Sequence, residues 1–119
     1  MHELSVCQAL VEQVVRVARE HGAGSVARVT IGVGALSGTE PALLRQAYPI
    51  ACAGTPAEGS TLEINERPIR VRCALCGAET DARANRLLCG ACGDWHTQLL
   101  SGDELLLEQV ELAKLAEAI

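Results

Sequence analysis

The chain has 119 residues, enough for one modest globular unit with at most a small appendage. Its formal net charge is −5 at pH 7, and its aromatic residues are limited to one Trp and one Tyr. Nucleic-acid-binding proteins usually have a basic face and stacking aromatic rings, so this composition argues against a nucleic-acid partner. No apolar stretch reaches transmembrane length, and polar residues interrupt the amino-terminal segment where a signal peptide would have its apolar core. We therefore expect a cytoplasmic protein with no membrane segment.

The spacing of apolar residues predicts a first helix over residues 3–21. Gly22 follows, as glycines often do after a helix because they accept a positive φ. An alternating run rich in β-branched residues then predicts a strand over residues 27–33. The predicted apolar face of the helix consists of Leu4, Cys7, Leu10, Val11, Val14, Val17 and Ala18.

A second helix is predicted to begin after Thr39, whose hydroxyl can cap it. Glu40 falls in its first turn, and Pro41 falls where a missing N–H group does no harm. Pro49 falls within this segment, and a proline inside a helix costs about 3 kcal/mol. The helix is therefore expected either to end near Tyr48 or to kink and continue to Ala53. Its predicted core side chains are Leu43, Leu44 and Ala47.

Two further strands complete the predicted sheet. Residues 61–71 hold the second strand. The third covers residues 105–112, for which a helix fits nearly as well, and residues 113–119 are expected to form a short helical tail. Together the elements predict an α+β fold, in which two helices pack on a small three-stranded sheet with an inserted zinc-ribbon-like module.

Residues 72–94 lose all hydrophobic periodicity and contain two Cys-x-x-Cys pairs separated by twelve residues. In a cytosolic chain, such pairs indicate a metal site more than they indicate disulfides. Zinc bound by four thiolates is tetrahedral and leaves no open position, so this site is expected to be structural. Iron in the same four sulfurs, as in a rubredoxin-like electron carrier, is the alternative. The four ligands are Cys73, Cys76, Cys89 and Cys92.

The domain organisation is predicted from this change of pattern. Residues 1–71 and 95–119 are expected to form one α/β domain, and residues 72–94 an inserted zinc-binding module. A segment this short cannot build a hydrophobic core of its own, so the metal must hold it together.

A histidine directly after the first methionine offers a second, open site. The α-amine of Met1 and the ring of His2 can close chelate rings around one ion, together with deprotonated backbone amides. Such a planar set of nitrogen atoms suits Ni(II) or Cu(II) rather than tetrahedral zinc. Glu3 would offset the unfavourable effect of the helix dipole on a cation there. The alternative is that His2 is an ordinary terminal residue with no ligand role.

Five motifs occur together along the chain. They are M-H-E at the start, I-G-x-G-x-L-S-G-x-E-P at residues 31–41, G-T-P-A-E-G-S-x-L at 54–62, the two cysteine knuckles, and S-G-D-E-L-L-L at 101–107. In this combination the chain resembles the HypA/HybF family, the nickel-insertion accessory proteins of [NiFe] hydrogenase maturation. The resemblance extends over essentially the whole chain.

The resemblance implies a nickel metallochaperone with a nickel-binding α/β domain and an inserted zinc module. It implies that Zn²⁺ is structural, and that Ni²⁺ is cargo delivered with a partner GTPase to the hydrogenase large subunit. Which hydrogenase receives the nickel, or whether urease does, stays open. By the match of M-H-E, the nickel residues fall on Met1, His2 and Glu3. By the match of the knuckles, the zinc ligands fall on the four paired cysteines. A monomer and a homodimer both stay open.

Other functions and some departures from the family pattern are also considered. A zinc-ribbon module that binds protein or nucleic acid, without any nickel function, is the alternative interpretation. An enzyme is not expected, because the chain shows no nucleophile–base set and no phosphate-binding loop. Pro49 and Cys52 fall where the family usually keeps an uninterrupted helix, and Gly90 replaces a common proline. Cys7 and Cys52 are interpreted as small buried apolar residues. His96 is interpreted as an exposed residue, with an accessory ligand role as the alternative.

Overall fold

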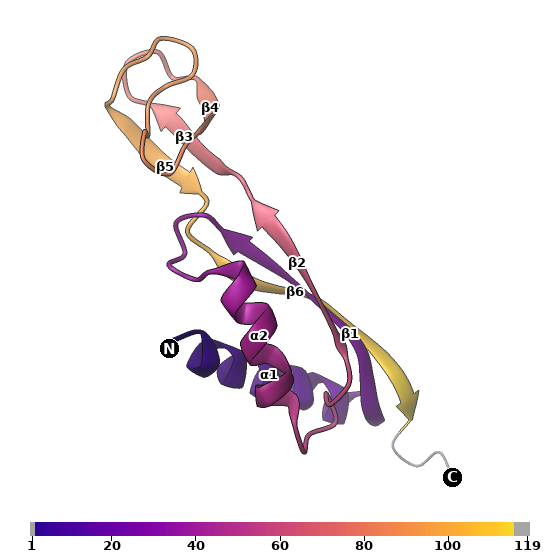
Figure 1. Ribbon diagram of the computed structural model, residues 1–119. Helices are drawn as coiled ribbons and strands as arrows, with labels where there is room; N and C mark the ends of the chain where they lie inside the picture. Colours follow the sequence, from indigo (N-terminus) through magenta and orange to yellow (C-terminus); the bar gives the residue numbers. More distant parts are fainter. Residues whose placement is uncertain (1, 116–119) are drawn as a thin grey trace. The chain divides into compact units, whose positions relative to one another are not determined.

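The computed structural model describes the backbone of residues 2–115 and the side chains of residues 2–113 (Figure 1). This part of the chain has two three-stranded sheets, with strand orders β2-β1-β6 and β4-β3-β5. The predicted α+β class with two helices is confirmed. No helix among the described residues is long and apolar enough to cross a membrane. The elements are α1 (His2–Glu20), β1 (Ala23–Gly34), α2 (Pro41–Cys52), β2 (Thr61–Arg67), β3 (Ile69–Cys73), β4 (Glu79–Ala82), β5 (Thr97–Ser101) and β6 (Leu105–Leu115).

The described residues fall into two compact units. The first, which we call the helical unit, comprises residues 2–31, 39–65 and 107–115 and includes both helices. The second, which we call the knuckle unit, comprises residues 32–38 and 66–106 and includes the four paired cysteines.

These units differ from the predicted division, which set only residues 72–94 apart from the rest of the chain. In the structure β3 pairs antiparallel with both β4 and β5, so these three strands belong together. The knuckle unit therefore includes a small sheet as well as the metal-binding turns. The assignment of one metal to each segment stays a prediction.

The core of the helical unit forms where α1 packs against α2. Cys7, Val14 and Ala18 are completely buried on the predicted apolar face of α1. Leu44 of α2 and Ile31 of β1 are also completely buried. Each large aliphatic side chain removed from water in this way contributes about 1.5–3 kcal/mol. The helical unit thus has an apolar core that requires no metal.

The beginning of α2 differs from the prediction by one residue. Its N-cap is Glu40 and not Thr39, while Pro41 lies in the first turn as expected. Glu40 has extended backbone angles (φ −95°, ψ 117°), and its own side chain makes no capping hydrogen bond. The cap was predicted too early because the local sequence does not show which of the two residues is the last extended one.

α2 continues through Pro49 and ends at Cys52, which is close to the second of the two predicted outcomes. The packing explains why: Leu44, Tyr48 and Cys52 are almost completely buried, whereas Pro49 is exposed. The side of the helix that loses a hydrogen bond therefore faces solvent, where water can replace the bond. The prediction that Leu43 faces the core was wrong, because 44 % of this residue is exposed.

Two predictions about the later strands also need correction. The expected strand over residues 61–71 is divided at Pro68 into β2 and β3, because proline has no N–H group to donate to a neighbouring strand. Residues 113–115 belong to β6 and not to a helical tail, because this strand pairs with β1 along the sheet. The remaining tail residues, 116–119, lie outside the described part of the chain.

Two glycines allow a close backbone contact within the knuckle unit. The N–H of Gly34 donates to the carbonyl of Glu104 over 2.8 Å, and the N–H of Leu36 donates to the carbonyl of Gly102 over 2.7 Å. A Cβ atom on Gly34 would overlap the Gly102 carbonyl, and one on Gly102 would lie 2.8 Å from the side chain of Ile69. Only glycine fits at both positions.

Candidate metal centre

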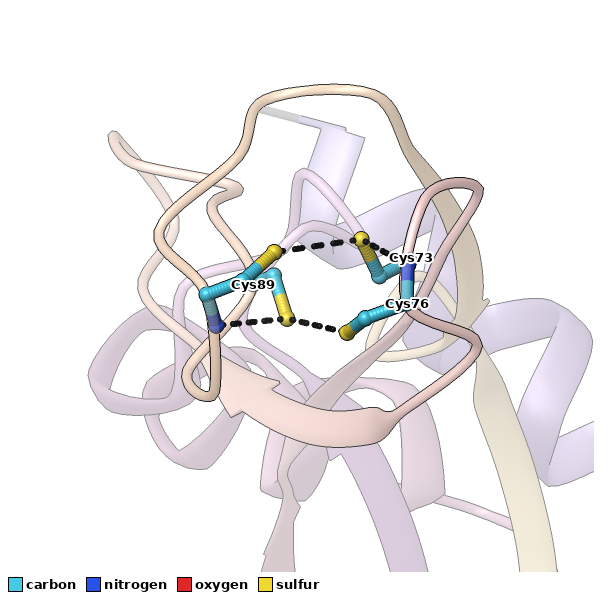
Figure 2. A group of neighbouring side chains, drawn as sticks. Cys73, Cys76 and Cys89 are labelled. Carbon is cyan, nitrogen blue, oxygen red and sulfur yellow. Dashed lines mark hydrogen bonds between the residues drawn. The ribbon is translucent and has the colours of Figure 1, made fainter.

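The knuckle unit brings the four predicted cysteines into one cluster, with their sulfur atoms within 4.8 Å of one another. Cys73 ends β3, and Cys76 lies in the turn that follows it (Figure 2). Cys89 and Cys92 belong to the second knuckle. The Cys73–Cys92 and Cys76–Cys89 sulfur pairs are each 3.6 Å apart. Zinc–sulfur bonds of about 2.3 Å in a tetrahedron place the sulfurs about 3.8 Å apart. The cluster therefore has the donor atoms and the spacing that a zinc ion requires.

The first knuckle directs two backbone amides at one sulfur. The N–H groups of Leu75 and Cys76 donate to the Cys73 sulfur over 3.3 and 3.4 Å. Gly77 closes the turn with a φ of 76°, and its N–H donates to the Cys73 carbonyl over 3.0 Å. The positive φ of Gly77 thus lets the turn close while two amides point at the Cys73 sulfur.

The second knuckle repeats this arrangement. Ala91 and Cys92 donate their N–H groups to the Cys89 sulfur over 3.3 and 3.4 Å. Gly93 has a φ of 79° and donates to the Cys89 carbonyl over 2.9 Å. The amide of Cys89 itself donates to the carbonyl of Asp94 over 2.9 Å. The two halves of the site are thus held by matching backbone contacts.

These contacts divide the four thiols into two kinds. The amide of Cys76 has the largest effect on the pKa of Cys73 and lowers it. At Cys89 the largest effect again comes from a backbone amide, that of Cys92, and the pKa falls to about 6. At Cys76 and Cys92 a backbone amide has the largest effect and lowers the pKa, but neighbouring sulfurs and burial together outweigh it and raise the pKa overall. Four thiolates repel one another, and a bound divalent cation removes this obstacle to full ionisation.

Gly90 makes a contact that a proline at this position could not make. Its N–H donates to the Thr80 hydroxyl of β4 over 2.8 Å. A Cβ atom on Gly90 would lie 3.1 Å from the Thr80 Cβ, so the glycine also allows a close approach. This contact ties the second knuckle to the small sheet, and no local sequence signal predicted it.

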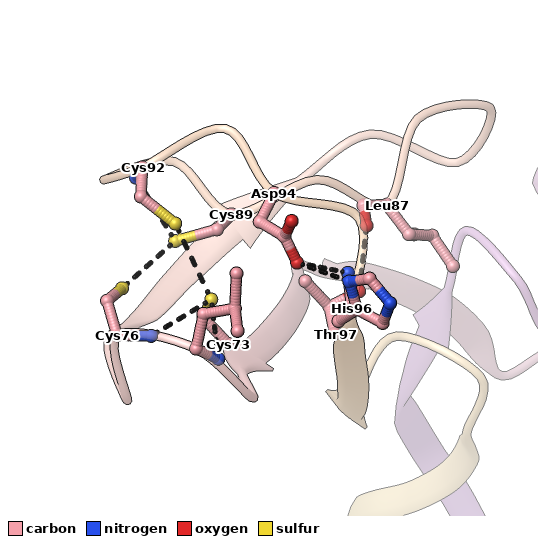
Figure 3. A network of polar contacts seen from close by, with 9 residues as sticks. Cys73, Cys76, Leu87, Cys89, Cys92, Asp94, His96 and Thr97 are labelled. Carbon is pink, nitrogen blue, oxygen red and sulfur yellow. Dashed lines mark hydrogen bonds and ion pairs between the residues drawn. The ribbon is translucent and has the colours of Figure 1, made fainter.

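His96 lies beside the cluster but is held by a carboxylate (Figure 3). Its Nδ1 lies 2.8 Å from Asp94 Oδ2, and its backbone N–H donates to the same oxygen over 2.7 Å. The ring stacks on Trp95 with 3.7 Å between centroids, and half of the side chain is exposed. Among the described residues the metal-type cluster contains the four cysteines alone. The sequence analysis did not predict the role of Asp94, although an Asp side chain often accepts a hydrogen bond from the backbone N–H two residues later, here that of His96.

At the amino terminus, Met1 lies outside the described residues, while His2 and Glu3 begin α1. The His2 side chain is 54 % exposed, and its Nδ1 lies 3.6 Å from Glu3 Oε2. Glu3 is only 8 % exposed and accepts a 3.3 Å hydrogen bond from the backbone N–H of Glu40. Burial alone would raise the pKa of the Glu3 carboxyl, but the amides of Glu3 and Glu40 outweigh it and lower the pKa. The predicted nickel role of this segment stays a prediction.

Cys7 and Cys52 are buried free thiols within the helical unit, as expected of small apolar residues. Burial is the largest reason that the pKa of Cys7 rises to about 11, and it raises the pKa of Cys52 as well. The Cys7 sulfur points at the Leu44 carbonyl, 3.6 Å away. Neither cysteine belongs to the cluster described above.

The fold and the cluster define a class: small α+β metal-binding proteins with a closed four-cysteine centre suited to zinc. The family of hydrogenase/urease nickel incorporation metallochaperones, HypA, has a sequence model that matches residues 1–112. A hydrogenase maturation factor HypA from Nitrosospira multiformis is 51 % identical over 112 residues, covering 94 % of this chain and 97 % of that protein. The HypA of Aquifex aeolicus is 38 % identical over the same lengths.

Two solved structures share the fold. The solution structure of the Ni metallochaperone HypA from Helicobacter pylori has a TM-score of 0.67, with 21 % identity over 94 % of this chain and 97 % of that one. Another HypA solution structure has a TM-score of 0.72, with 24 % identity over 98 % of both chains. The chain belongs to the HypA family of nickel metallochaperones for hydrogenase and urease.

Proposed function

We propose that this protein binds Ni(II) at Met1, His2 and Glu3 and delivers it during the maturation of [NiFe] hydrogenase. One observation carries the proposal: His2 is exposed and begins α1, and α1 is fixed by its packing against α2. The four cysteines form a separate cluster that has no open coordination position. A cargo ion needs a site that it can leave, and the exposed His2 side chain meets that need.

The chemistry of this segment suits a square-planar ion. The α-amine and the amide nitrogen of His2 close a five-membered ring around a metal, and the same amide and the His2 Nδ1 close a six-membered ring. Ni(II) accepts such nitrogen sets, whereas zinc prefers a tetrahedron. Binding must displace protons from these nitrogens, so nickel affinity is expected to fall as the pH falls.

The knuckle unit is proposed to bind a structural zinc ion. When bound, zinc supplies folding free energy to a segment with few buried apolar side chains. The chain's own residues contribute the four sulfurs and the amides that stabilise them as thiolates. In this proposal zinc stays with the protein while nickel is passed on.

The proposed partners are a hydrogenase maturation GTPase and the hydrogenase large subunit, in the cytoplasm. Urease is a second recipient to consider, because the family description names both enzymes. The protein itself is proposed to act as a carrier and not as an enzyme. Family membership favours this function over a zinc-ribbon interaction module that has no nickel role.

Calorimetric titration with Ni(II) tests the proposal. The zinc-loaded chain with a free Met1 is expected to take up about one nickel ion. A chain extended before Met1, and the His2→Ala variant, are each expected to lose this uptake and keep zinc, because each removes one nitrogen donor. His21→Ala is the matched control, since it removes an exposed histidine beyond the other end of α1. Unchanged nickel uptake in the extended chain would remove the amino terminus from the proposal.

A further inference from the structure

We infer that the Glu3 carboxylate is a positioning group, which holds the proposed nickel site against the amino end of α2 and is not itself a nickel ligand. The inference rests on the proposed function, because it concerns the segment that would bind nickel. It adds a role for one side chain that neither the nickel chemistry nor the helix alone requires.

The first step is the unusual way in which α2 is capped. In a capping box, a Glu or Gln at the third helical position reaches back to the N–H of the N-cap residue. The third residue of α2 is Leu43, which has no acceptor, and the N-cap residue Glu40 makes no capping bond with its own side chain. Glu3 accepts from the Glu40 N–H over 3.3 Å instead. A residue 37 positions away thus does what a local glutamate usually does.

The second step is the burial of Glu3. Terminal residues usually fray, because a first helical turn leaves its N–H groups without partners within the helix. Glu3 is only 8 % exposed although it follows directly after His2, whose side chain is 54 % exposed. A carboxylate is seldom buried unless it is paired, and here it lies among the amide of Glu40 and the ring of His2. The contact therefore fixes the first turn of α1 in place.

The third step is the consequence for coordination. The proposed ligands are the α-amine, the His2 amide and the His2 ring, which are bonded directly to the part of the backbone that Glu3 anchors. Restricting that backbone lowers the entropy that nickel binding must remove. If the carboxylate moved to nickel, the Glu40 N–H would lose its acceptor at the start of a packed helix. The anchoring role is therefore the one in which the Glu40 N–H keeps its hydrogen bond to Glu3.

The test compares Glu3→Gln with Glu3→Ala in the zinc-loaded full chain with a free Met1, using Ni(II) alone. The Gln oxygen can still accept from Glu40, so this variant is expected to retain most of the nickel affinity. Ala has no acceptor and is expected to bind nickel about fivefold more weakly, the usual effect of losing a cap. Both should keep the wild-type d–d absorption band, because the set of ligands is the same. Glu12→Ala, an exposed glutamate on α1, is the matched control.

Two results would overturn the inference. If Glu3→Gln weakens binding as much as Glu3→Ala and both shift the d–d band, the carboxylate is a ligand. If Glu3→Ala binds nickel as the wild type does, the anchor has no effect on the site.

Amide hydrogen exchange at Glu40 in the nickel-free protein separates this inference from the proposed function. Faster exchange is expected in Glu3→Ala and near wild-type exchange in Glu3→Gln, whether or not the chain binds nickel. Equal exchange in all three proteins would refute the capping contact by itself. If the wild type takes up no nickel but Glu40 still exchanges faster in Glu3→Ala than in the wild type, only the proposed function is refuted.

Discussion

Gly90 donates a 2.8 Å hydrogen bond to Thr80, and this single contact ties the second knuckle to β4. Thr80→Val keeps the branched shape but removes the acceptor, so we expect the zinc-bound state to lose about 1 kcal/mol. The measurement is transfer of zinc to a competing chelator, which should be about fivefold faster. Gly90→Pro should have a larger effect, because the ring also meets Thr80.

Thr61→Val, on β2 of the helical unit, is the matched control for a surface threonine. It should leave the transfer rate unchanged. A wild-type rate in Thr80→Val would show that the contact does not stabilise the site.

Individual ligands were easier to predict than their supports. The spacing of the two cysteine pairs predicted all four members of the cluster, because one short turn is enough to place each pair. The hydroxyl of Thr80 was not predicted, since its contact with Gly90 depends on how β4 pairs with β3. The Glu3–Glu40 contact was missed for a similar reason: its partners come from two different helices.

At the scale of elements, α2 tolerates a proline on its exposed side. Replacing Pro49 by Ala restores a backbone N–H donor and introduces a good helix former. The loss of the proline ring also raises the conformational entropy of the unfolded chain, which offsets part of this gain in stability. We expect the zinc-loaded protein to gain about 1–2 kcal/mol in its free energy of unfolding. Denaturant unfolding followed by the helical circular dichroism signal measures this change.

Pro41→Ala provides the comparison for that prediction, because Pro41 lies in the first turn, where its missing N–H has no partner within the helix. It should change the free energy of unfolding by much less than Pro49→Ala. Destabilisation by Pro49→Ala would mean that the proline contributes packing or rigidity that the exposed position does not reveal.

The elements themselves were predictable where a repeating local pattern defines them. The apolar spacing in α1 predicted its buried face, and alternation predicted the centre of β1. The end of α2 could not be decided locally, because burial of Leu44 and Tyr48 competes with the cost of Pro49. Residues 113–115 have a sequence that suits a helix, but pairing with β1 extends β6 through them.

At the scale of the whole molecule, the two units should respond differently to loss of zinc. The helical unit buries its own apolar core, whereas buried apolar residues in residues 66–106 are few: Ile69, Val71 and two of the cysteines. Treatment with a strong chelator should therefore unfold residues 66–106 and leave most of the helical signal. Limited proteolysis and backbone amide spectra locate the change.

Cys73→Ala should imitate the chelator, because three thiolates hold zinc less tightly than four. The same variant also removes the acceptor of two amides in the first knuckle. Loss of the helical signal together with zinc would show instead that the two units fold as one. Protection of residues 66–106 after zinc removal would show that the small sheet is stable without metal.

The division into units was only partly predictable. The loss of periodicity after residue 71 coincides with the start of the metal-binding turns. The sequence predicted no strand over residues 97–101, where β5 pairs with β3, and the sequence of β3 does not show which sheet it joins. Pro68 is the one local feature near the boundary, and its effect depends on which neighbour a strand pairs with.

The four sulfurs are not equally accessible to an attacking reagent. Cys73 and Cys89 are 2 % and 3 % exposed, whereas Cys76 and Cys92 are exposed. The inner pair also accepts two amide hydrogen bonds per sulfur, which makes it the better-shielded half. In the zinc-loaded protein, an oxidant or an alkylating agent should therefore modify Cys76 and Cys92 first, while Cys73 and Cys89 would still hold the ion.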